Sequence, residues 1–438
     1  MNRRHFSRLL LAAAGGVAFP RRARSITRPQ VRVNGSRLNR LFEQLRRVGR
    51  TPAGGVERLA YSEEDRQARE TVMGWMREAG LDVRIDEAAN IIARRAGSDP
   101  DLPPLLAGSH IDSVPDGGAY DGNVGALGAL EAAWTLADEG IVTRHPLEIV
   151  IFQNEEGGLY GSEAMAGRLT EADLDQVSQS GRTVREGIAF LGGTPDRIRN
   201  AARRSGEIGA YLELHIEQGG MLEVEGMDIG VVEGIVGIEW WDVTVEGFAN
   251  HAGTTPMDGR RDALLAAARF VEAVNDIVTG IPGRQVGTVG QIAAYPGAPN
   301  VIPGRVTASL ELRDLDAERI QTLFRRIRAE ANAIGERTGT TFTFVSRGLD
   351  IAPALTDQRV QGAIVGAARE LSLSFRLMPS GAGHDAQSLA ALAPIGMIFI
   401  PSAGGVSHSP REHSDPEDLV NGANVLVNGL LGLDGMVG

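Results

Sequence analysis

Apolar and polar positions along the first half of the chain form a pattern of strands separated by helices. Residues 37–95 show two helical stretches and then a short strand at 81–85. Residues 105–107 and 147–152 are apolar runs of strand length, and residues 124–138 between them carry small apolar residues in a helical pattern. Strands that alternate with helices are typical of a layered α/β domain.

The pattern changes in the middle of the chain. Strands and helices there follow the order β-α-β-β-α-β, at residues 238–246, 258–281, 288–294, 305–313, 317–337 and 341–345. This order is that of a ferredoxin-like unit. Afterwards the first pattern resumes, with a helix at 357–371 and a strand at 397–400. We therefore expect one domain over 37–235 and 348–438, interrupted by a smaller domain over 236–347.

The first 24 residues have the features of an export signal. Arg3 and Arg4 precede Phe6, an apolar run follows at 9–19, and small residues close it. Paired arginines in this position are typical of the twin-arginine route, so a periplasmic protein is expected. The alternative is a basic N-terminal segment without a signal function.

The composition of the chain excludes several kinds of partner and of catalytic or metal site. The chain has 438 residues, a formal net charge of −12, no cysteine and no lysine. An acidic chain without a basic tract repels nucleic acid and anionic lipid, so neither is an expected partner. The absence of cysteine excludes disulfides, thiolate zinc sites and cysteine nucleophiles. Any metal must be held by histidine, aspartate and glutamate.

Several histidines and acids lie where predicted strands end or turn. The chain has eight histidines, and three of them share this placement with nearby acids: His110, Asp121, Glu155, Glu156, His215 and His408. His215 is expected on the polar side of a strand at 211–217, opposite Leu212 and Leu214. Imidazole and carboxylate without thiolate suit zinc, manganese, cobalt or nickel. Each residue alone fits a structural or surface role, but the set predicts a metal site.

Three histidines, one aspartate and one glutamate could hold two ions if the aspartate bridges them. Asp112, two residues after His110, is placed to fix the orientation of that imidazole. The second glutamate of the pair would be free to act as a general base.

Longer motifs resemble a known family. They are GSHIDSV at 108–114, YDG at 120–122, NEEG at 154–157, ELHIEQG at 213–219, HAGTTPM at 251–257, PNVIPG at 299–304, SGAGHDA at 380–386 and SHSP at 407–410. Together they resemble the M20 metallo-amidohydrolases. The similar branch contains N-carbamoyl-L-amino acid hydrolases, allantoate amidohydrolases and β-ureidopropionases. The resemblance runs from about residue 37 to the end of the chain.

The resemblance implies a dinuclear metal centre in a large α/β catalytic domain, interrupted by a ferredoxin-like lid and dimerisation domain. The implied ligands are His110, Asp121, Glu156, His215 and His408, with Asp121 bridging two divalent ions. Zinc is the first expectation, and manganese, cobalt or nickel are alternatives. Glu155 would be the general base and Asp112 the orienting carboxylate. His408, rather than His413, precedes the Ser-Pro of the family motif.

The resemblance also implies residues that bind the substrate. His251 is similar to a family histidine that reaches into the neighbouring subunit, which implies a homodimer through the lid; the alternative is a turn histidine packed on its own domain. Arg313 would grip a substrate carboxylate, or pair with Asp314 or Asp316. Gln218 and Asn300 would be companion amides, and His384 would line the pocket.

One loop departs from the family pattern. After the glutamate pair, relatives carry an Arg-Phe and several further residues before Gly-Ser. Here GGLY at 157–160 leads directly to Gly161 and Ser162. The departure concerns the substrate's side-chain pocket and leaves the implied metal ligands unchanged.

These features favour a hydrolase of ureido C–N bonds, acting on N-carbamoyl-L-amino acids that carry a carboxylate. The products would be an amino acid, carbon dioxide and ammonia. Allantoate and β-ureidopropionate are alternative substrates. Two further alternatives are an aminoacylase or dipeptidase of the same family and an exported binding protein without activity.

Overall fold

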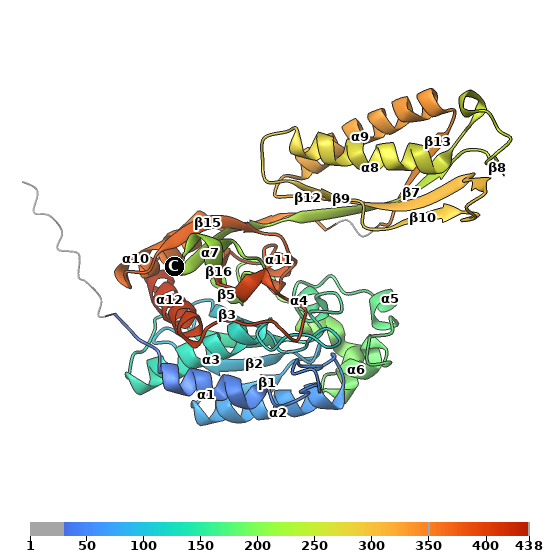
Figure 1. The fold of residues 1–438 in the computed structure, drawn as a ribbon. Helices are drawn as coiled ribbons and strands as arrows, with labels where there is room; N and C mark the ends of the chain where they lie inside the picture. The colour runs from blue at the N-terminus through green and yellow to red at the C-terminus, as the bar shows by residue number, and fades with distance from the viewer. Residues whose placement is uncertain (1–29, 349–350, 437–438) are drawn as a thin grey trace, which may run out of the picture. The chain divides into compact units, whose positions relative to one another are not determined.

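The computed structural model describes residues 30–348 and 351–436 (Figure 1). The expected export signal at 1–24 therefore lies outside the described residues. All elements below belong to one unit that begins at Val31. Within the described ranges, every helix is too short or too polar to cross a bilayer.

The larger sheet has nine strands in the described residues, in the order β1-β2-β4-β3-β5-β16-β6-β14, with β15 paired to β6. Their bounds are β1 (Asp82–Ile85), β2 (Ile91–Arg95), β3 (Leu105–His110), β4 (Leu147–Phe152), β5 (Ala210–Ile216), β6 (Ile229–Ile235), β14 (Ala354–Leu355), β15 (Phe375–Ser380) and β16 (Ile395–Ile400). The four neighbours β4, β3, β5 and β16 are parallel. Their carboxyl ends consequently meet at one edge of the sheet.

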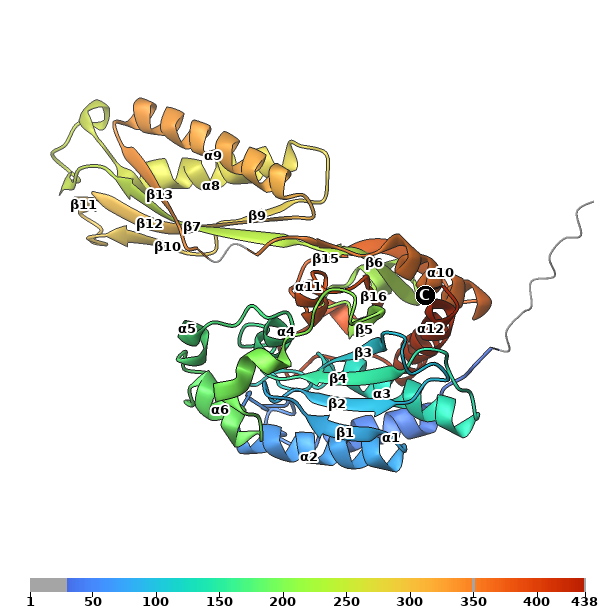
Figure 2. The ribbon, with the colours of Figure 1, turned by 180° about the vertical axis from the view of Figure 1, so that it is seen from behind.

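Helices cover both faces of this sheet (Figures 1 and 2). One face packs against α1 (Gly35–Leu45), α2 (Glu63–Glu78), α3 (Asn123–Asp138), α10 (Gln358–Glu370) and α12 (Pro416–Asp434). The other packs against α4 (Tyr160–Met165), α7 (Met221–Glu225) and α11 (Asp385–Leu389), and a side cluster holds α6 (Val184–Phe190) and α5 (Glu171–Leu174). Two covered faces explain why the central strands are apolar runs.

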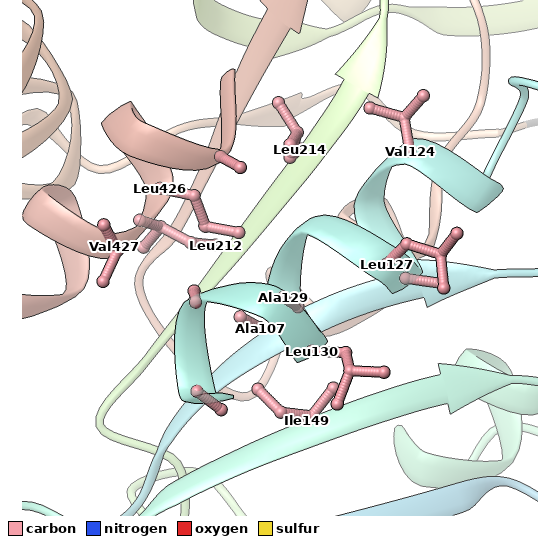
Figure 3. Packing of buried hydrophobic residues seen from close by; sticks show 14 of the residues in the cluster. Ala107, Val124, Leu127, Ala129, Leu130, Ile149, Leu212, Leu214, Leu426 and Val427 are labelled. Atoms are coloured by element: carbon pink, nitrogen blue, oxygen red, sulfur yellow. The ribbon is translucent and has the colours of Figure 1, made fainter. Parts of the chain in front are cut away.

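The packing of α3 brings its first turn close to the strands. Figure 3 shows Leu127 and Leu130 of α3 near Leu212 of β5 and Leu426 of α12, all in one buried cluster. At Gly125 an added Cβ would lie 2.3 Å from the carbonyl oxygen of Leu214. Only glycine permits this approach, which sets the helix directly against β5.

The smaller sheet is antiparallel, in the order β10-β12-β7-β13, with β9 paired to β12. Its elements are β7 (Gly237–Glu246), α8 (Ala263–Thr279), β9 (Val286–Thr288), β10 (Ile292–Tyr295), β12 (Arg305–Asp314), α9 (Ala317–Thr338) and β13 (Thr341–Ser346). Both helices lie on one face, where they share a core with the sheet (Figure 2). This arrangement is ferredoxin-like, and the predicted α/β fold class is confirmed.

Several predicted elements differ in detail. The strand expected at 288–294 is two strands, β9 and β10. Thr288 lies opposite Glu311 and Ile292 opposite Ala308, so this side has one residue more than β12 between the two pairs. Such an extra residue is a β-bulge. The helix expected from 258 begins at Ala263, where the side chain of Asp262 accepts two backbone N–H groups.

Several elements were not predicted, among them β2, β6, β15 and α12. Glycine interrupts the apolar pattern of β6, and asparagine and glycine interrupt that of α12. The strand expected at 211–217 does form, but both of its sides are buried, so Glu213 and His215 do not face solvent.

Candidate metal centre

The carboxyl edge of the larger sheet positions the predicted ligands. His110 is the last residue of β3, rather than part of the following turn as expected. Glu155 and Glu156 follow the end of β4, and His215 is near the end of β5. His408 lies in the loop after β16. Since these four strands are neighbours, residues far apart in the sequence meet at this edge.

One group of possible ligands consists of His110, Asp121 and His215, all buried. The Nε2 atom of His215 lies 3.0 Å from Oδ1 of Asp121, and that of His110 lies 3.7 Å from the same oxygen. The ligand atoms of the group all lie within 4.8 Å of one another. At Gly122, with φ of 63°, an added Cβ would lie 2.5 Å from the His110 ring, so glycine is required there.

A second group consists of Asp121, Glu156 and His408. The Nε2 atom of His408 lies 3.0 Å from Oδ2 of Asp121 and 3.6 Å from Oε2 of Glu156. The two oxygens of Asp121 therefore face two different groups. A carboxylate placed in this way can bridge two cations.

The electrostatics of the two groups also fit cations. Burial raises the pKa of the Glu156 carboxyl to about 8, and the negative charge of Asp121 adds to this effect. Burial alone would raise the pKa of Asp121, but the three neighbouring imidazoles of His110, His215 and His408 hold it well below its usual range. Positive charge lowers the repulsion between such buried, closely spaced carboxylates. Imidazolium supplies that charge here, and metal ions can supply it instead.

Glu155 belongs to neither group but lies beside the first. Its Oε2 is 3.7 Å from Nε2 of His110, and its side chain lines the adjoining cavity. Burial raises the pKa of the Glu155 carboxyl well above its ordinary value; His110 opposes this, and Asp385 and Glu156 add to it. A raised pKa is suited to a general base that must also return a proton near neutral pH.

Asp112 connects the first imidazole with the glutamate pair. Its two carboxylate oxygens accept the backbone N–H groups of Glu155, at 3.3 Å, and Glu156, at 3.2 Å. The Nδ1 atom of His110 lies 3.1 Å from the backbone carbonyl oxygen of Asp112 and 3.6 Å from its carboxylate. Asp112 thus fixes the loop of the glutamate pair relative to His110, a wider role than the predicted orientation of one ring.

Glu412 was not predicted, although it holds two ligand loops together. Its Oε1 accepts the backbone N–H groups of Tyr120 and Asp121, and its Oε2 accepts the hydroxyl of Ser407, next to His408. An acid between two histidines, His408 and His413, was a signal that could have found it.

His413 lies apart from both ligand groups. Its imidazole contacts the hydroxyl of Tyr120, at 2.9 Å, and the carboxylate of Asp415, at 3.1 Å. His408, not His413, is therefore the histidine placed with Asp121 and Glu156.

Glu213 is a second residue that the sequence did not single out. It is fully buried and accepts the hydroxyl of Ser109 at 2.8 Å and the backbone N–H of Ala386 at 2.9 Å. It therefore joins β3 and β5 to the start of α11. His384, just before α11, is also buried, and its ring lies 4.5 Å from that of His215.

A cavity of about 1050 Å³ adjoins both groups. Its lining includes these predicted site residues: Asp121, Glu155, Glu156, Gln218, Arg313, His384 and His408. The side-chain amide of Gln218 donates to Oδ2 of Asp121 at 2.8 Å. The cavity therefore gives a small molecule access to the ligand groups.

Arg313 has a different partner from those expected. Its guanidinium donates to both carboxylate oxygens of Glu311, at 2.8 and 3.1 Å, and to the carbonyl of Gly381 at 2.6 Å. The alternative to substrate binding, a salt bridge with Asp314 or Asp316, is therefore wrong; Glu311 is the partner, because residues two apart on a strand share a side.

His251 and Asn300 are not brought to this cavity. His251 is exposed on β8 (Asn250–His251), which pairs with β11 (Val301–Ile302). Its Nδ1 accepts the backbone N–H groups of Gly253 and Thr254, which orients the ring. The carbonyl of Asn300 accepts the backbone N–H of Ala252. The two predicted residues therefore lie near each other, on the smaller domain.

Known proteins resemble the whole described unit. The model of peptidase family M20/M25/M40 matches residues 106–431. The N-carbamoyl-L-amino acid amidohydrolase of Geobacillus stearothermophilus is 43% identical over 399 residues, which cover 90% of this chain and 97% of that protein. The allantoate amidohydrolase of Bacillus subtilis is 35% identical over 393 residues, 88% of this chain and 95% of that protein. A crystal structure of a hydantoinase/carbamoylase family amidase from Burkholderia multivorans has a TM-score of 0.87 at 38% identity, covering 92% of this chain and 99% of that one.

Proposed function

We propose, since the chain belongs to peptidase family M20/M25/M40, that it hydrolyses the ureido C–N bond of N-carbamoyl-L-amino acids. The products would be the amino acid, carbon dioxide and ammonia. The observation that carries this proposal is the position of Asp121, with one oxygen 3.0 Å from His215 and the other 3.0 Å from His408. Glu155 stands beside this arrangement as an acid that neither ligand group uses.

Two divalent ions fit the two groups. His110, Asp121 and His215 would hold one, and Asp121, Glu156 and His408 the other. Nitrogen and oxygen donors without sulfur favour zinc, with manganese, cobalt or nickel as alternatives. Such ions would supply Lewis-acid activation of water and of the ureido carbonyl, which is a poor electrophile.

The side chains would manage protons and position. Glu155 would take a proton from the attacking water and return it to the leaving nitrogen. The Asp112 carboxylate would keep Glu155 in place by accepting the backbone N–H of Glu155. Gln218, fixed on Asp121, would present its amide to the substrate from the cavity wall.

The substrate carboxylate would bind near Arg313 on the cavity wall. The Arg313 guanidinium holds Glu311 in this structure. The substrate carboxylate would therefore accept from the remaining N–H groups of Arg313 or displace Glu311. His251 and Asn300, exposed away from their own cavity, would serve the cavity of a second copy, so the active form would be a homodimer.

Allantoate is a second candidate substrate, since the allantoate amidohydrolase of Bacillus subtilis aligns over most of both chains. Allantoate shares the ureido group and the carboxylate, so the same residues would act on it.

The test is a substrate panel. Protein loaded with zinc, manganese or cobalt is incubated with N-carbamoyl-L-amino acids, N-carbamoylglycine, allantoate, β-ureidopropionate and dipeptides, and ammonia and amine release are measured. Ammonia from the N-carbamoyl compounds supports the proposal. Release of amines from dipeptides alone, or no turnover with any metal, contradicts it.

A further inference from the structure

The loop after the glutamate pair forms one tight turn that ends at Leu159. The backbone N–H groups of Gly158 and Leu159 both donate to the carbonyl of Glu155, at 2.9 and 2.8 Å. The carbonyl of Leu159 in turn accepts the backbone N–H of Glu163 and the hydroxyl of Ser162. Leu159 is therefore anchored on both sides, one turn away from Glu155.

Leu159 is also held in an unusual conformation. Its φ is 60°, in the left-handed region that a leucine rarely adopts. Strained residues of this kind persist where the surrounding structure over-determines them, and they gather at functional sites. Leu159 lines the same cavity as Glu155 and Glu156.

Other apolar residues also line this cavity. They come from β7, from β14 and the residues just before it, and from the residues just after α11: Ile238, Ile351, Pro353, Ala354, Leu355, Ala390 and Ala391. Leu355 is 66% exposed, a large apolar side chain at the cavity wall that gains from being covered.

The charged side chains in this part of the cavity already have partners. Arg168 donates to both carboxylate oxygens of Glu163, at 2.7 and 2.6 Å, and to the carbonyl of Ser388. Arg313 holds Glu311 in the same way. A charged substrate side chain would compete with Glu163 or Glu311 for these guanidinium groups, whereas an apolar one would only displace water.

We propose that this wall is the side-chain pocket of the substrate, and that Leu159 makes the enzyme selective for N-carbamoyl-L-amino acids with apolar side chains. Acidic side chains and the second ureido group of allantoate would be disfavoured. This inference rests on the proposed function.

The test compares kcat/KM for N-carbamoyl-L-leucine, N-carbamoyl-L-aspartate, allantoate and N-carbamoylglycine, which has no side chain. We expect the wild-type protein to favour the leucine compound over N-carbamoylglycine by about tenfold or more, as one buried apolar group provides. Leu159→Asn keeps nearly the same shape in a residue that tolerates positive φ. We expect it to lower the leucine-to-glycine ratio of kcat/KM about tenfold.

Two further variants complete the design. Leu377→Asn changes a leucine that is 46% exposed on β15 and lies outside the cavity lining, and its ratio should equal that of the wild type. Leu355→Asn, at an exposed position, should lower the ratio as Leu159→Asn does and replaces it if that variant does not fold.

The outcomes separate the two proposals. A preference for aspartate or allantoate, or an unchanged ratio in Leu159→Asn and Leu355→Asn, overturns the apolar pocket while the hydrolysis stands. If N-carbamoylglycine and every other ureido compound remain intact with loaded protein, the proposed function itself falls.

Discussion

The predicted site has two halves, and they differ in how far a single chain assembles them. The first half lies at the carboxyl edge of the larger sheet, and the second lies at the β8–β11 strand pair of the smaller domain. At the sheet edge, ligands from strands and loops meet in two groups, and the ligand atoms of each group lie within 4.8 Å of one another; the first group is buried, while His408 of the second is exposed. His251 on β8 and Asn300, just before β11, are exposed and line no part of the cavity. Pairing of β3 with β5 brings His110 and His215 together, whereas Asp121 and His408 lie on loops that Glu412 holds in place. The second half needs another surface, which we propose is a second copy of the chain.

The largest expected effect is at the sheet edge. Asp121→Asn removes the charge and one of the two oxygens that face the ligand groups, so we expect metal content to fall from about two ions per chain to below one. Turnover should fall below detection. Elemental analysis of the purified variant measures this, with the exposed Asp415→Asn as control. Full metal content in Asp121→Asn would show that the bridge is not needed.

Glu155→Gln should separate chemistry from metal binding. The amide cannot take a proton, so we expect kcat to fall by about 10²–10⁴-fold while two ions per chain remain bound. The exposed Glu43→Gln is the matched control and should keep its rate. Loss of metal together with activity would instead make Glu155 a ligand.

His251→Ala tests whether the exposed half serves a second copy. In the cavity of the second copy, the His251 imidazole would donate to the oxyanion that develops on the ureido carbonyl, so we expect kcat to fall by about 10²–10³-fold, as for loss of one such donor. Mixing subunits of His251→Ala with subunits of Glu155→Gln should restore about a quarter of wild-type activity, since random exchange makes half of the dimers hybrid with one complete site each. Activity that stays absent after verified subunit exchange would place His251 outside the neighbouring site.

Glu412→Gln should weaken the contacts between the loops that carry Asp121 and His408 without removing a metal ligand. Glutamine keeps one acceptor oxygen and loses the negative charge, so its bonds to the amides of Tyr120 and Asp121 should weaken, and the Ser407 hydroxyl can no longer donate to an oxygen at Oε2. We expect metal affinity to fall by about 10–100-fold, measured by competition with a chelator. The exposed Glu417→Gln should bind metal as the wild type does. Equal affinity in both variants would contradict the positioning role.

The smallest effect is a pH dependence of metal affinity. The hydrogen bond with Asp121 raises the pKa of His408 to about 9, and burial raises the pKa of Glu156 to about 8. Both groups are thus protonated in the metal-free protein at neutral pH, and a metal must displace those protons. Affinity should rise at least tenfold per pH unit up to about pH 8. Calorimetry in buffers of different ionisation enthalpy measures the released protons, and constant affinity between pH 6.5 and 8 would refute the shifts.

Pattern alone predicted the fold class and the smaller domain, because their strands and helices keep clear periodicity. The histidines and acids at strand ends could also be predicted, since neighbouring parallel strands bring the residues at their carboxyl ends to one edge of the sheet. Elements whose glycines or asparagines interrupt the apolar pattern, such as β6 and α12, could not be found in this way.

The role of Glu412 could not be predicted for a different reason, although its place between His408 and His413 could have drawn attention to the residue. It acts through backbone N–H groups and a hydroxyl, and such partners leave no residue pattern in the sequence. The pair of Arg313 and Glu311 was within reach, because residues i and i+2 of a strand lie on one side.

The order of the four parallel strands has a consequence for how the chain matures. His110 comes from the third strand in chain order and His408 follows the last one, so a nascent or truncated chain cannot present both ligand groups. A metal ion at the second group would therefore bind only to the finished fold, and its binding energy would raise the unfolding free energy of complete molecules alone. Availability of the ion during synthesis would then decide how much of the protein survives proteolysis.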